Sequence, residues 1–466
     1  MRTEDIDQLR QLVGPDRVST DPAELALLSR DASYRSQKLE RCGQNVALAE
    51  AVVTPRDEAD IVAVLQWCSA NGVPVTPRGP GSSVVGSQIP LQGGLLLDLR
   101  HFDQVLEIDP YNRRVRVQGS ILLSDLETEL NQHGLTGGHY PQSFYTAGVA
   151  GSIAMRGTGT FSSLYGSVED RLAELRVVLP SGQIYQSHNA PRASTGPDLR
   201  QLFLGSEGCF GVITEVTLKV VPIPESRLYA SFAFDSFEAA LDTTRAMQAA
   251  GVVPAVLRIY DPVETAAKHA QFTVADGSWL MVLLYEGAAE LTRTQAQIVA
   301  RLAAEQGGRD QGEEPAQSWE RKRFDVSWMS DQVSRDGGVA EAIEIAATWS
   351  SLPKVMETMR QAAGRTMDTV MGHVSHIYPD GACLYVISTG TKPTEGEALR
   401  AYDQLWSDVM EAVLAEGAII GHHHGVGYER APWLEAEHGA TGIELLHGLK
   451  RLLDPAGVMN PGKLTF

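Results

Sequence analysis

The chain has 466 residues, of which 43% are hydrophobic and 21% charged, and it carries a formal net charge of −19 at pH 7. This length predicts roughly two to three domains, and the acidic balance argues against nucleic acid or an anionic membrane as the main partner. The 4 cysteines are scattered without C-x-x-C spacing, which indicates neither a zinc site nor a disulfide framework and fits a reducing cytosol. The acidic start is not a secretory signal and the longest apolar run, residues 279–285, is too short to span a bilayer, so we expect a cytoplasmic protein.

Helices are predicted at the start of the chain. Apolar residues recur at near-helical spacing in the first 45 residues. Residues 54–57 read Thr-Pro-Arg-Asp, which predicts a helix with Thr54 as its N-cap and an end at Gly72. A strand over residues 74–76 follows and leads directly into a glycine-rich loop.

That loop, residues 77–86, reads P-R-G-P-G-S-S-V-V-G. Glycine lets the backbone approach a ligand closely, and successive N–H groups in such a loop form a concave anion site. Arg78 adds a cation beside it. We interpret the loop as a diphosphate cradle; the alternative is an ordinary glycine-rich turn between strands. It is neither a Walker A loop nor a G-x-G-x-x-G motif that opens a helix.

Short strands are predicted next, over residues 94–99, 105–108, 115–117, 175–179 and 210–220. Ser124 and Glu127 have the spacing of a capping box, which predicts a short helix ending near Gly134. Residues 141–160 are rich in glycine, serine and threonine but keep apolar spacing, so we favour a ligand-lining turn and helix start over a flexible linker.

The pattern of predicted strands and helices changes after residue 225. Strands over 229–234, 255–260, 279–285 and 382–388 alternate with helices over 237–250, 290–305 and 399–414, which predicts a second α+β domain with helices on one face of a sheet. Residues 305–320 are expected to form an exposed loop. The last residues return to small and polar types at 421–427, and a terminal helix is expected to end at Asp454.

Five segments together resemble one family of flavoproteins. They are P-R-G-P-G-S-S (77–83), S-F-Y-T-A-G-V-A-G-S-I (143–153), Y-G-S-V-E-D (165–170), G-S-E-G-C-F-G-V-I-T (205–214) and N-P-G-K (460–463). In this order and spacing they resemble the FAD-binding family of vanillyl-alcohol-oxidase type, also called PCMH-type. The resemblance implies an α+β fold: a two-subdomain FAD-binding domain over 1–225 (core 46–225), an inserted α+β cap domain over 226–415, and a C-terminal segment, 416–466, that returns to the FAD site.

The resemblance also implies which residues bind FAD. The first loop is expected to wrap the diphosphate, and the second and third segments to line the isoalloxazine ring and the rest of the cofactor. The family usually has glycine where this chain has Pro80, which removes one N–H donor. No His or Cys lies between residues 72 and 100, so we predict FAD held non-covalently. The expected FAD-binding residues are Pro77, Arg78, Gly79, Pro80, Gly81, Ser82, Ser83, Pro141, Ser143, Thr146, Ala147, Gly148, Gly151, Ser152, Gly157, Thr158, Tyr165, Gly166, Glu207, Gly208, Gly211, Val212, Ile213 and Asn460.

Within that family, four further segments are similar to the branch of alkyldihydroxyacetonephosphate (alkylglycerone-phosphate) synthases. They are G-H-Y-P-Q-S-F (138–144), P-A-V-L-R-I-Y-D (254–261), Y-P-D-G-A-C-L-Y (378–385) and H-H-H-G-V-G (422–427). This resemblance implies a transferase of ether-lipid synthesis, without net redox chemistry. It would exchange the acyl group of acyl-dihydroxyacetone phosphate for a fatty alcohol through an adduct at flavin N5.

Two residues in strands are candidates for catalysis. Arg258 lies among apolar residues, where a guanidinium needs an anionic partner; that partner is either a structural acid such as Asp261 or, as the resemblance implies, the substrate phosphate or departing carboxylate. Tyr385 is either a core tyrosine or, by the resemblance, the acid/base at C1 of the substrate. Acting as a base would require a lowered pKa.

The histidines of the tail are the third candidate. We assign His422, His423 and, most of all, His424 to deprotonation of the incoming alcohol and to phosphate contact, because histidine transfers protons near neutral pH. Three adjacent side chains in an extended segment cannot all point one way, so we predict no metal.

The segment G-H-V-S-H (372–376) resembles part of the metal site of D-2-hydroxy-acid dehydrogenases. The alternative function is therefore an FAD-linked oxidase or dehydrogenase of a D-2-hydroxy acid; a third reading is a flavin-binding protein without turnover. A lipid substrate implies peripheral membrane contact, although no strongly basic amphipathic helix provides it. We also expect a homodimer.

Overall fold

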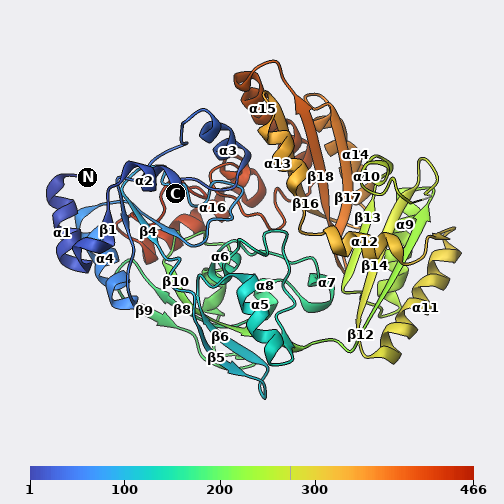
Figure 1. Ribbon diagram of the computed structural model, residues 1–466, viewed down its shortest axis with the longest axis horizontal. Helices are drawn as coiled ribbons and strands as arrows, with labels where there is room; N and C mark the ends of the chain where they lie inside the picture. Colours follow the sequence, from blue (N-terminus) through green and yellow to red (C-terminus); the bar gives the residue numbers. More distant parts are fainter. Residues whose placement is uncertain (273) are drawn as a thin grey trace.

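The computed structural model describes residues 1–272 and 274–466. Figure 1 shows two halves side by side, with the last helix returning to lie against the first half. We call residues 1–225 the N-terminal domain, 226–415 the cap domain and 416–466 the tail. No helix of the described residues is both long and apolar enough to cross a membrane.

The N-terminal domain contains two larger sheets, in agreement with a two-subdomain arrangement, and a small antiparallel sheet of the two short strands β7 (Leu135–Thr136) and β11 (Val221–Pro222). The first has the order β1-β2-β4-β3, in which β2, β4 and β3 run parallel: β1 (Val18–Ser19), β2 (Ala51–Val53), β4 (Leu95–Asp98) and β3 (Val75–Arg78). The second is antiparallel with the order β5-β6-β10-β8-β9: β5 (Val105–Asp109), β6 (Arg114–Gln118), β10 (Val212–Lys219), β8 (Leu172–Val178) and β9 (Ile184–Gln186). Helices α1 (Thr3–Val13) and α4 (Glu58–Asn71) share a buried apolar core with the first sheet.

The other elements of this domain, and one 3₁₀ turn of the tail, are shorter. They are α2 (Pro22–Leu28), α3 (Tyr34–Arg41), α5 (Leu123–Gln132), β7 (Leu135–Thr136), α6 (Val149–Ala154), α7 (Ser162–Tyr165), α8 (Val168–Arg171), β11 (Val221–Pro222) and single 3₁₀ turns at Pro15–Arg17, Leu199–Leu202 and Ala431–Trp433. The predicted strands of the domain are all present within three residues of their expected bounds.

Two predicted helix starts are wrong. Helix α4 begins at Glu58 and its N-cap is Asp57, whose carboxylate accepts the N–H of Asp60 at 3.0 Å. Thr54 lies outside the helix because its N–H donates a hydrogen bond to the carbonyl of Arg17, the residue just before β1. The predicted end is confirmed: Gly72 stops the helix at φ +64°.

The capping box at Ser124 is also wrong. Helix α5 begins at Leu123, before Ser124, and no side chain caps it. Glu127 instead accepts hydrogen bonds from the N–H of Gly137 at 2.8 Å and the hydroxyl of Tyr140 at 2.7 Å. The carboxylate of Glu127, which the local pattern assigned to the helix N-terminus, therefore accepts hydrogen bonds from residues outside the helix.

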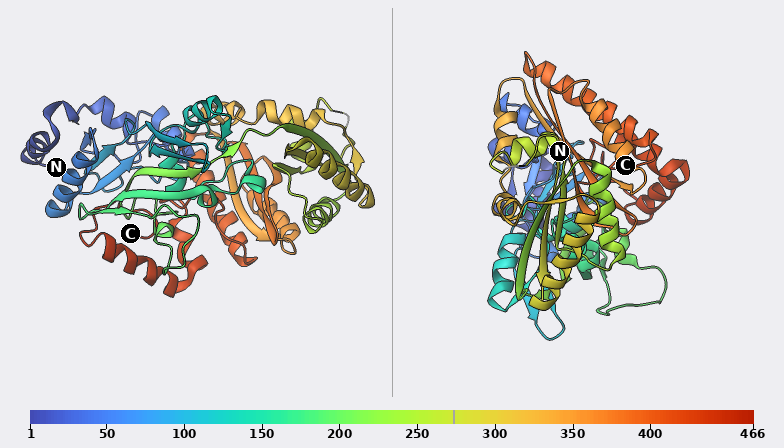
Figure 2. Two further views of the ribbon diagram at one scale, coloured as in Figure 1. Left: turned by 90° about the horizontal axis from the view of Figure 1, so that it is seen from below. Right: turned by 90° about the vertical axis from the view of Figure 1, so that its right-hand side faces the viewer.

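The cap domain is built on one antiparallel seven-stranded sheet with the order β15-β12-β14-β13-β17-β18-β16. Its strands are β15 (Arg309–Asp310), β12 (Ser226–Phe234), β14 (Trp279–Gly287), β13 (Val256–Tyr260), β17 (Thr369–Tyr378), β18 (Gly381–Thr391) and β16 (Gly338–Thr348). Its helices are α9 (Phe237–Ala249), α10 (Pro262–Lys268), α11 (Ala289–Glu305), α12 (Glu314–Lys322), α13 (Ser327–Ser334), α14 (Leu352–Ala363) and α15 (Glu395–Ala415). Figure 2 shows this sheet edge-on beside the N-terminal domain.

Helices cover both faces of the cap sheet, so the prediction of one covered face is wrong. On one face, Met356 of α14 packs against Gly372 of β17. On the other, Trp319 of α12 stacks over the guanidinium of Arg258 of β13. The predicted loop over 305–320 contains β15 and most of α12, because Ala316 and Trp319, three residues apart on one face of the helix, are buried.

The tail ends in α16 (Leu434–Leu453), capped at Asp454 as predicted, and then crosses back to the first sheet. Val75 of β3 pairs with Met459, and the N–H of Asn460 is donated to the carbonyl of Val75. The tail therefore completes the N-terminal domain, although it follows the cap domain in sequence.

Candidate active site

A cavity of about 580 Å³ lies between the N-terminal domain and the cap sheet. A cavity of this size suits a cofactor together with part of a substrate. It brings together most of the residues predicted to bind FAD and four of the five predicted catalytic residues. Those that line it are Pro77, Gly79, Pro80, Gly81, Ser82, Ser83, Pro141, Ser143, Thr146, Ala147, Gly148, Gly151, Ser152, Gly157, Thr158, Glu207, Gly208, Gly211, Val212, Ile213, Arg258, Tyr385, His423 and His424.

Five predicted site residues lie outside the cavity lining. Arg78 supports the glycine loop from below, Gly166 turns at φ +81° against Asp170, and His422 sits behind His423. The Tyr165 hydroxyl is donated to the carboxylate of Glu286 in the cap domain at 2.6 Å. Asn460 donates its amide to the carbonyls of Ser87 and Glu207 at 2.7 and 2.6 Å, which fixes two cavity segments to the tail.

The glycine loop has the form of an anion cradle. Among the described residues, the N–H groups of Gly81, Ser82 and Ser83 have no hydrogen-bond partner. Gly81 has φ +101°, and a Cβ there would lie 2.5 Å from Nη2 of Arg78, so only glycine fits between the arginine and the cavity. Free amides over a buried guanidinium suit a diphosphate. The residues present therefore fit FAD along this wall.

Arg258 faces the cavity from β13 and is only 8% exposed. Its nearest polar partner is the Tyr260 hydroxyl at 3.4 Å, and its guanidinium lies 5.6 Å from the centre of the Trp319 ring. The structural alternative, an ion pair with Asp261, is not formed, because Asp261 pairs with Arg360 at 2.8 Å. Within the described residues Arg258 has no carboxylate partner, so it is available to a bound anion.

Tyr385 lines the cavity from β18, and its hydroxyl lies 2.8 Å from Nε2 of His423. Burial, and the nearby Cys383 and Glu344, raise the pKa of Tyr385 well above its ordinary value. The lowered pKa that a tyrosine base requires is therefore absent, and Tyr385 is a neutral hydroxyl that donates or relays a proton.

The chain of hydrogen bonds continues behind Tyr385. Nδ1 of His423 lies 2.7 Å from Nδ1 of His422, and Nε2 of His422 lies 2.7 Å from the hydroxyl of Tyr378. Burial lowers the pKa of His422 to about 4 and that of His423 well below its ordinary value, so both rings are neutral near pH 7.

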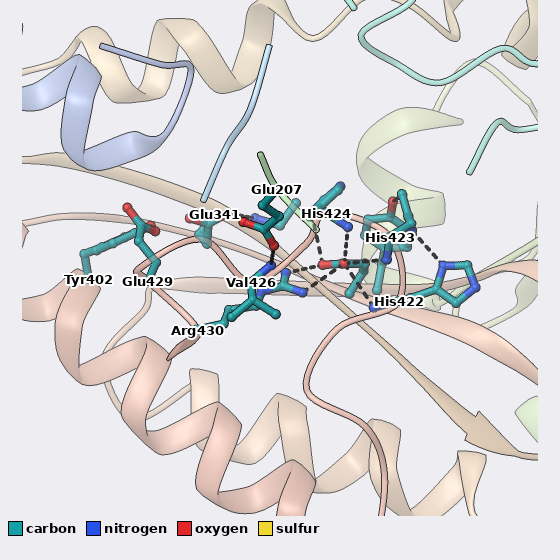
Figure 3. A network of polar contacts seen from close by, with 12 residues as sticks. Glu207, Glu341, Tyr402, His422, His423, His424, Val426, Glu429 and Arg430 are labelled. Atoms are coloured by element: carbon teal, nitrogen blue, oxygen red, sulfur yellow. Dashed lines mark hydrogen bonds and ion pairs between the residues drawn. The ribbon is translucent and has the colours of Figure 1, made fainter. Parts of the chain in front are cut away.

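One carboxylate positions the whole histidine segment. Glu344 of β16 is fully buried, and its Oε1 accepts the N–H groups of His422, His423 and His424 at 3.2, 3.1 and 2.9 Å. Figure 3 shows the three histidines side by side in the tail. Its other oxygen is 3.0 Å from Nδ1 of His424. Since a carboxylate only accepts, Nδ1 of His424 is the donor in this contact.

The buried guanidinium of Arg430 completes this cluster. It pairs with both oxygens of Glu344, Nη1 at 3.0 Å, and lies 5.0 Å from the centre of the Trp406 ring. Burial alone would raise the pKa of Glu344, but the positive charge of Arg430 and the contact with His424 hold it well below its ordinary value. Glu344 is therefore ionised throughout the physiological range.

A second carboxylate holds the tail from the N-terminal domain. Glu207, at φ +50°, accepts the N–H groups of Val426 at 2.7 Å and Gly427 at 2.8 Å, and the hydroxyl of Ser87 at 2.7 Å. Glu207 also lines the cavity, so its contact with FAD stays a prediction, and its hydrogen bonds give it a structural task. The tail segment 422–427 is thus held by one carboxylate from each domain: Glu344 binds the N–H groups of the three histidines, and Glu207 those of Val426 and Gly427. Figure 3 labels Glu207 with its partner Val426.

His376 and His139 also line the cavity but were not among the predicted site residues. His376 has φ +52° at a bulge in β17, which turns its ring into the cavity, and its Nδ1 lies 2.9 Å from Oγ of Ser162. Within the part of the chain that the structure describes, neither ring nitrogen of His139 has a hydrogen-bond partner, although the side chain is buried. The second histidine of G-H-V-S-H was the only sequence signal for His376; nothing local signals the bulge.

Cys383, His422 and His423 place one potential metal-ligand atom each within 4.8 Å of one another. The imidazole nitrogens, however, are engaged with one another and with Tyr378 and Tyr385. We therefore interpret the cluster as a hydrogen-bonded chain, and the absence of a metal stays a prediction.

Glu429, beside the cluster, gives a pH-dependent prediction. Burial and the nearby Glu341 and Asp31 raise its pKa to about 8 from 4.5, although the Tyr402 hydroxyl at 2.6 Å opposes the shift. The native state then keeps a proton that the unfolded chain loses, so stability falls as the pH rises from about 5 to about 8. In urea titrations, Glu429→Gln should lack this fall and be the more stable protein at pH 8. Parallel pH profiles for the two proteins would contradict the shift.

Comparisons with known proteins agree with this geometry. A family profile described as FAD linked oxidases, C-terminal domain, matches residues 223–464, and one described as FAD binding domain matches residues 49–187. An alkyldihydroxyacetonephosphate synthase of Caenorhabditis elegans is 29% identical over 460 residues, which covers 91% of this chain and 77% of that protein. Glycolate oxidase subunit GlcD of Bacillus subtilis is 27% identical over 487 residues, which covers 100% of this chain and 97% of the relative.

A solved structure of an alkyldihydroxyacetonephosphate synthase has the same fold, with a TM-score of 0.83 at 22% identity over 99% of this chain and 85% of that one. The predicted fold class is confirmed: an α+β fold with an FAD-binding domain and a cap domain. The residues along the glycine loop also fit the cofactor that the profiles imply. The chain belongs to the FAD-linked oxidases, as its sequence segments predicted, and its cofactor is FAD.

Proposed function

We propose that this enzyme exchanges the acyl group of an acyl-dihydroxyacetone phosphate for a long-chain alcohol. The observation that carries the proposal is Arg258, a buried guanidinium without a carboxylate partner, in one cavity with Tyr385 and His424. A substrate that is anionic, loses an acid and gains an alcohol needs a cation, a proton donor and a base. The named relative from Caenorhabditis elegans supports the same reaction.

Each residue has a distinct task in this proposal. Arg258 binds the phosphate or the departing carboxylate through its planar fork. Tyr385, a neutral hydroxyl, holds the proton exchanged at the reacting carbon. His424 takes the proton of the incoming alcohol at Nε2, because Glu344 fixes its other nitrogen as a donor. When bound, FAD supplies an electron-accepting ring beside the reacting carbon, and Gly79–Ser83 would hold its diphosphate.

Apolar residues of the cavity support an alkyl substrate. α13 and the segment before it contribute Val326, Met329 and Val333, and β16 contributes Ala340 and Ala342. These residues give a long-chain alcohol or acyl group an apolar surface next to the polar site. A lipid substrate would bring the protein to membranes peripherally, and we retain the homodimer and non-covalent FAD as predictions.

The second candidate is oxidation of a D-2-hydroxy acid, with electrons passed to a separate acceptor. The match to the glycolate oxidase subunit favours it, and Arg258 would then bind the substrate carboxylate. In this reaction Tyr385 and His423 would accept the hydroxyl proton.

One experiment separates the two reactions. Purified protein loaded with FAD is mixed anaerobically with palmitoyl-dihydroxyacetone phosphate and hexadecanol, or with D-lactate, glycolate and D-2-hydroxyglutarate. We expect an alkyl ether product by mass spectrometry, with no lasting flavin reduction. Full flavin reduction by a hydroxy acid, without any ether product, would replace our proposal with the second candidate.

A further inference from the structure

We propose that Tyr385, His423, His422 and Tyr378 form a proton relay that connects the active-site cavity with solvent. The inference rests on the proposed function only in that Tyr385 exchanges a proton with a substrate; either candidate reaction would use the relay. It assigns to Tyr378 and His422, which lie outside the cavity, a role in carrying protons to and from it.

The first observation is the continuity of the chain. Three successive contacts of 2.8, 2.7 and 2.7 Å join the Tyr385 hydroxyl to Nε2 of His423, Nδ1 of His423 to Nδ1 of His422, and Nε2 of His422 to the Tyr378 hydroxyl. In each imidazole, one ring nitrogen contacts the preceding member of the chain and the other ring nitrogen contacts the next member. That is the geometry in which a neutral histidine passes on a proton by changing its tautomer.

The second observation is where the chain begins and ends. Tyr385 and His423 line the cavity, whereas His422 and Tyr378 do not. Tyr378 is half-buried and is followed by the exposed Pro379 and Asp380 at the end of β17. The chain therefore runs from the reacting groups to a partly exposed tyrosine at the end of β17, next to surface residues.

The third observation is that every member is neutral near pH 7. Burial lowers the pKa of both histidines and raises the pKa of both tyrosines. A neutral chain has two consistent hydrogen-bond patterns. In one pattern every proton points from Tyr385 towards Tyr378, and in the other every proton points back.

The transfer balances without an ionic intermediate. As Tyr385 receives the proton released by a substrate O–H or C–H, its own proton passes to Nε2 of His423. The Nδ1 proton of His423 passes to His422, the Nε2 proton of His422 passes to Tyr378, and the Tyr378 proton passes to water. Counting the substrate and the water, five bonds to hydrogen break while five form; no member is oxidised, and the hydrogen-bond pattern is reversed. The reverse sequence delivers a proton into the cavity.

The shared proton gives a test without substrate. In protein labelled with ¹⁵N-histidine, NMR should detect coupling between Nδ1 of His422 and Nδ1 of His423 through the proton that lies between them. Tyr378→Phe should retain this coupling but slow exchange of the proton with solvent by about tenfold, because the outlet is cut. The matched control is Tyr285→Phe elsewhere in the cap sheet, which removes a buried hydroxyl that has no hydrogen-bond partner among the residues that the structure describes.

Steady-state kinetics give a second test of the relay. Tyr378→Phe should lower kcat by about tenfold with KM unchanged, less than the roughly 10²- to 10⁴-fold of a group that touches the substrate. Added imidazole should restore the lost rate, because it can accept the proton at His422. His422→Gln should lose the coupling and the relay together, since glutamine has no second ring nitrogen.

The outcomes distinguish the relay from the reaction. Absence of the His422–His423 coupling, or an exchange rate in Tyr378→Phe equal to that in Tyr285→Phe, overturns the relay even if turnover is found. Failure of both substrate sets overturns the proposed function, whereas coupling with slowed exchange in Tyr378→Phe would still support the relay.

Discussion

Replacing Glu344 with glutamine is expected to lower the free energy of unfolding by about 3–5 kcal/mol. The change keeps the size of the side chain but removes the negative charge that pairs with the fully buried Arg430 and weakens the acceptor for three successive N–H groups. Breaking one side of a buried ion pair costs about this much, because the remaining charge has no partner. The measurement is urea unfolding followed by circular dichroism, with the midpoint converted through the slope.

Glu341→Gln is the matched control on the same strand. Burial raises the pKa of Glu341, and within the described residues it forms no ion pair. Removing its charge should change the unfolding free energy by less than about 1 kcal/mol. Equal losses for the two variants would contradict the view that Glu344 organises the tail.

Replacing Arg258 with methionine is expected to separate catalysis from stability. For an anionic substrate, kcat/KM should fall by about 10²- to 10³-fold, because the side chain is the cavity's free cation among the described residues, and losing such a partner costs about 3–4 kcal/mol. The free energy of unfolding should stay the same or rise, since the native protein buries this guanidinium without a carboxylate. The measurements are steady-state kinetics and urea unfolding on one preparation.

Two further variants sharpen this result. Arg258→Lys keeps the positive charge but loses the planar guanidinium, so its kcat/KM should lie between that of the unmodified protein and that of Arg258→Met. Arg309→Met removes an arginine whose ion pair with Asp235 lies on the surface, and it should change neither quantity appreciably. If Arg258→Met destabilised the protein while substrate kinetics stayed normal, Arg258 would be a structural residue.

The sequence was informative wherever local composition carries the chemistry. The glycine loop at residues 77–86 and the triple histidine are short, unusual strings, and the structure brings both to one cavity. Strand periodicity likewise located β12, β13 and β14. Each of these features is determined by residues close together in the chain.

The sequence failed where a residue's role depends on a distant partner. Glu344 lies in β16, a strand without a distinctive pattern, and its importance appears only when the tail, almost eighty residues later, folds onto it. The errors at Thr54 and Ser124 have the same origin, since tertiary hydrogen bonds displaced the local caps. His376 depends on a bulge in β17, which no residue pattern announces.

The return of the tail to both domains has a consequence for how the protein can be dissected. Glu207 and Glu344, from opposite sides of the active site, each depend on N–H groups of residues 422–427, and β3 depends on Met459 for its last neighbour. A fragment cut after residue 225 would keep every glycine of the flavin loop, yet it would expose the edge of the first sheet at β3 and leave the buried Glu207 without its two N–H donors from the tail. We therefore expect that the flavin-binding half does not fold as an independent module, and that during synthesis it completes its folding only once residues 416–466 have left the ribosome.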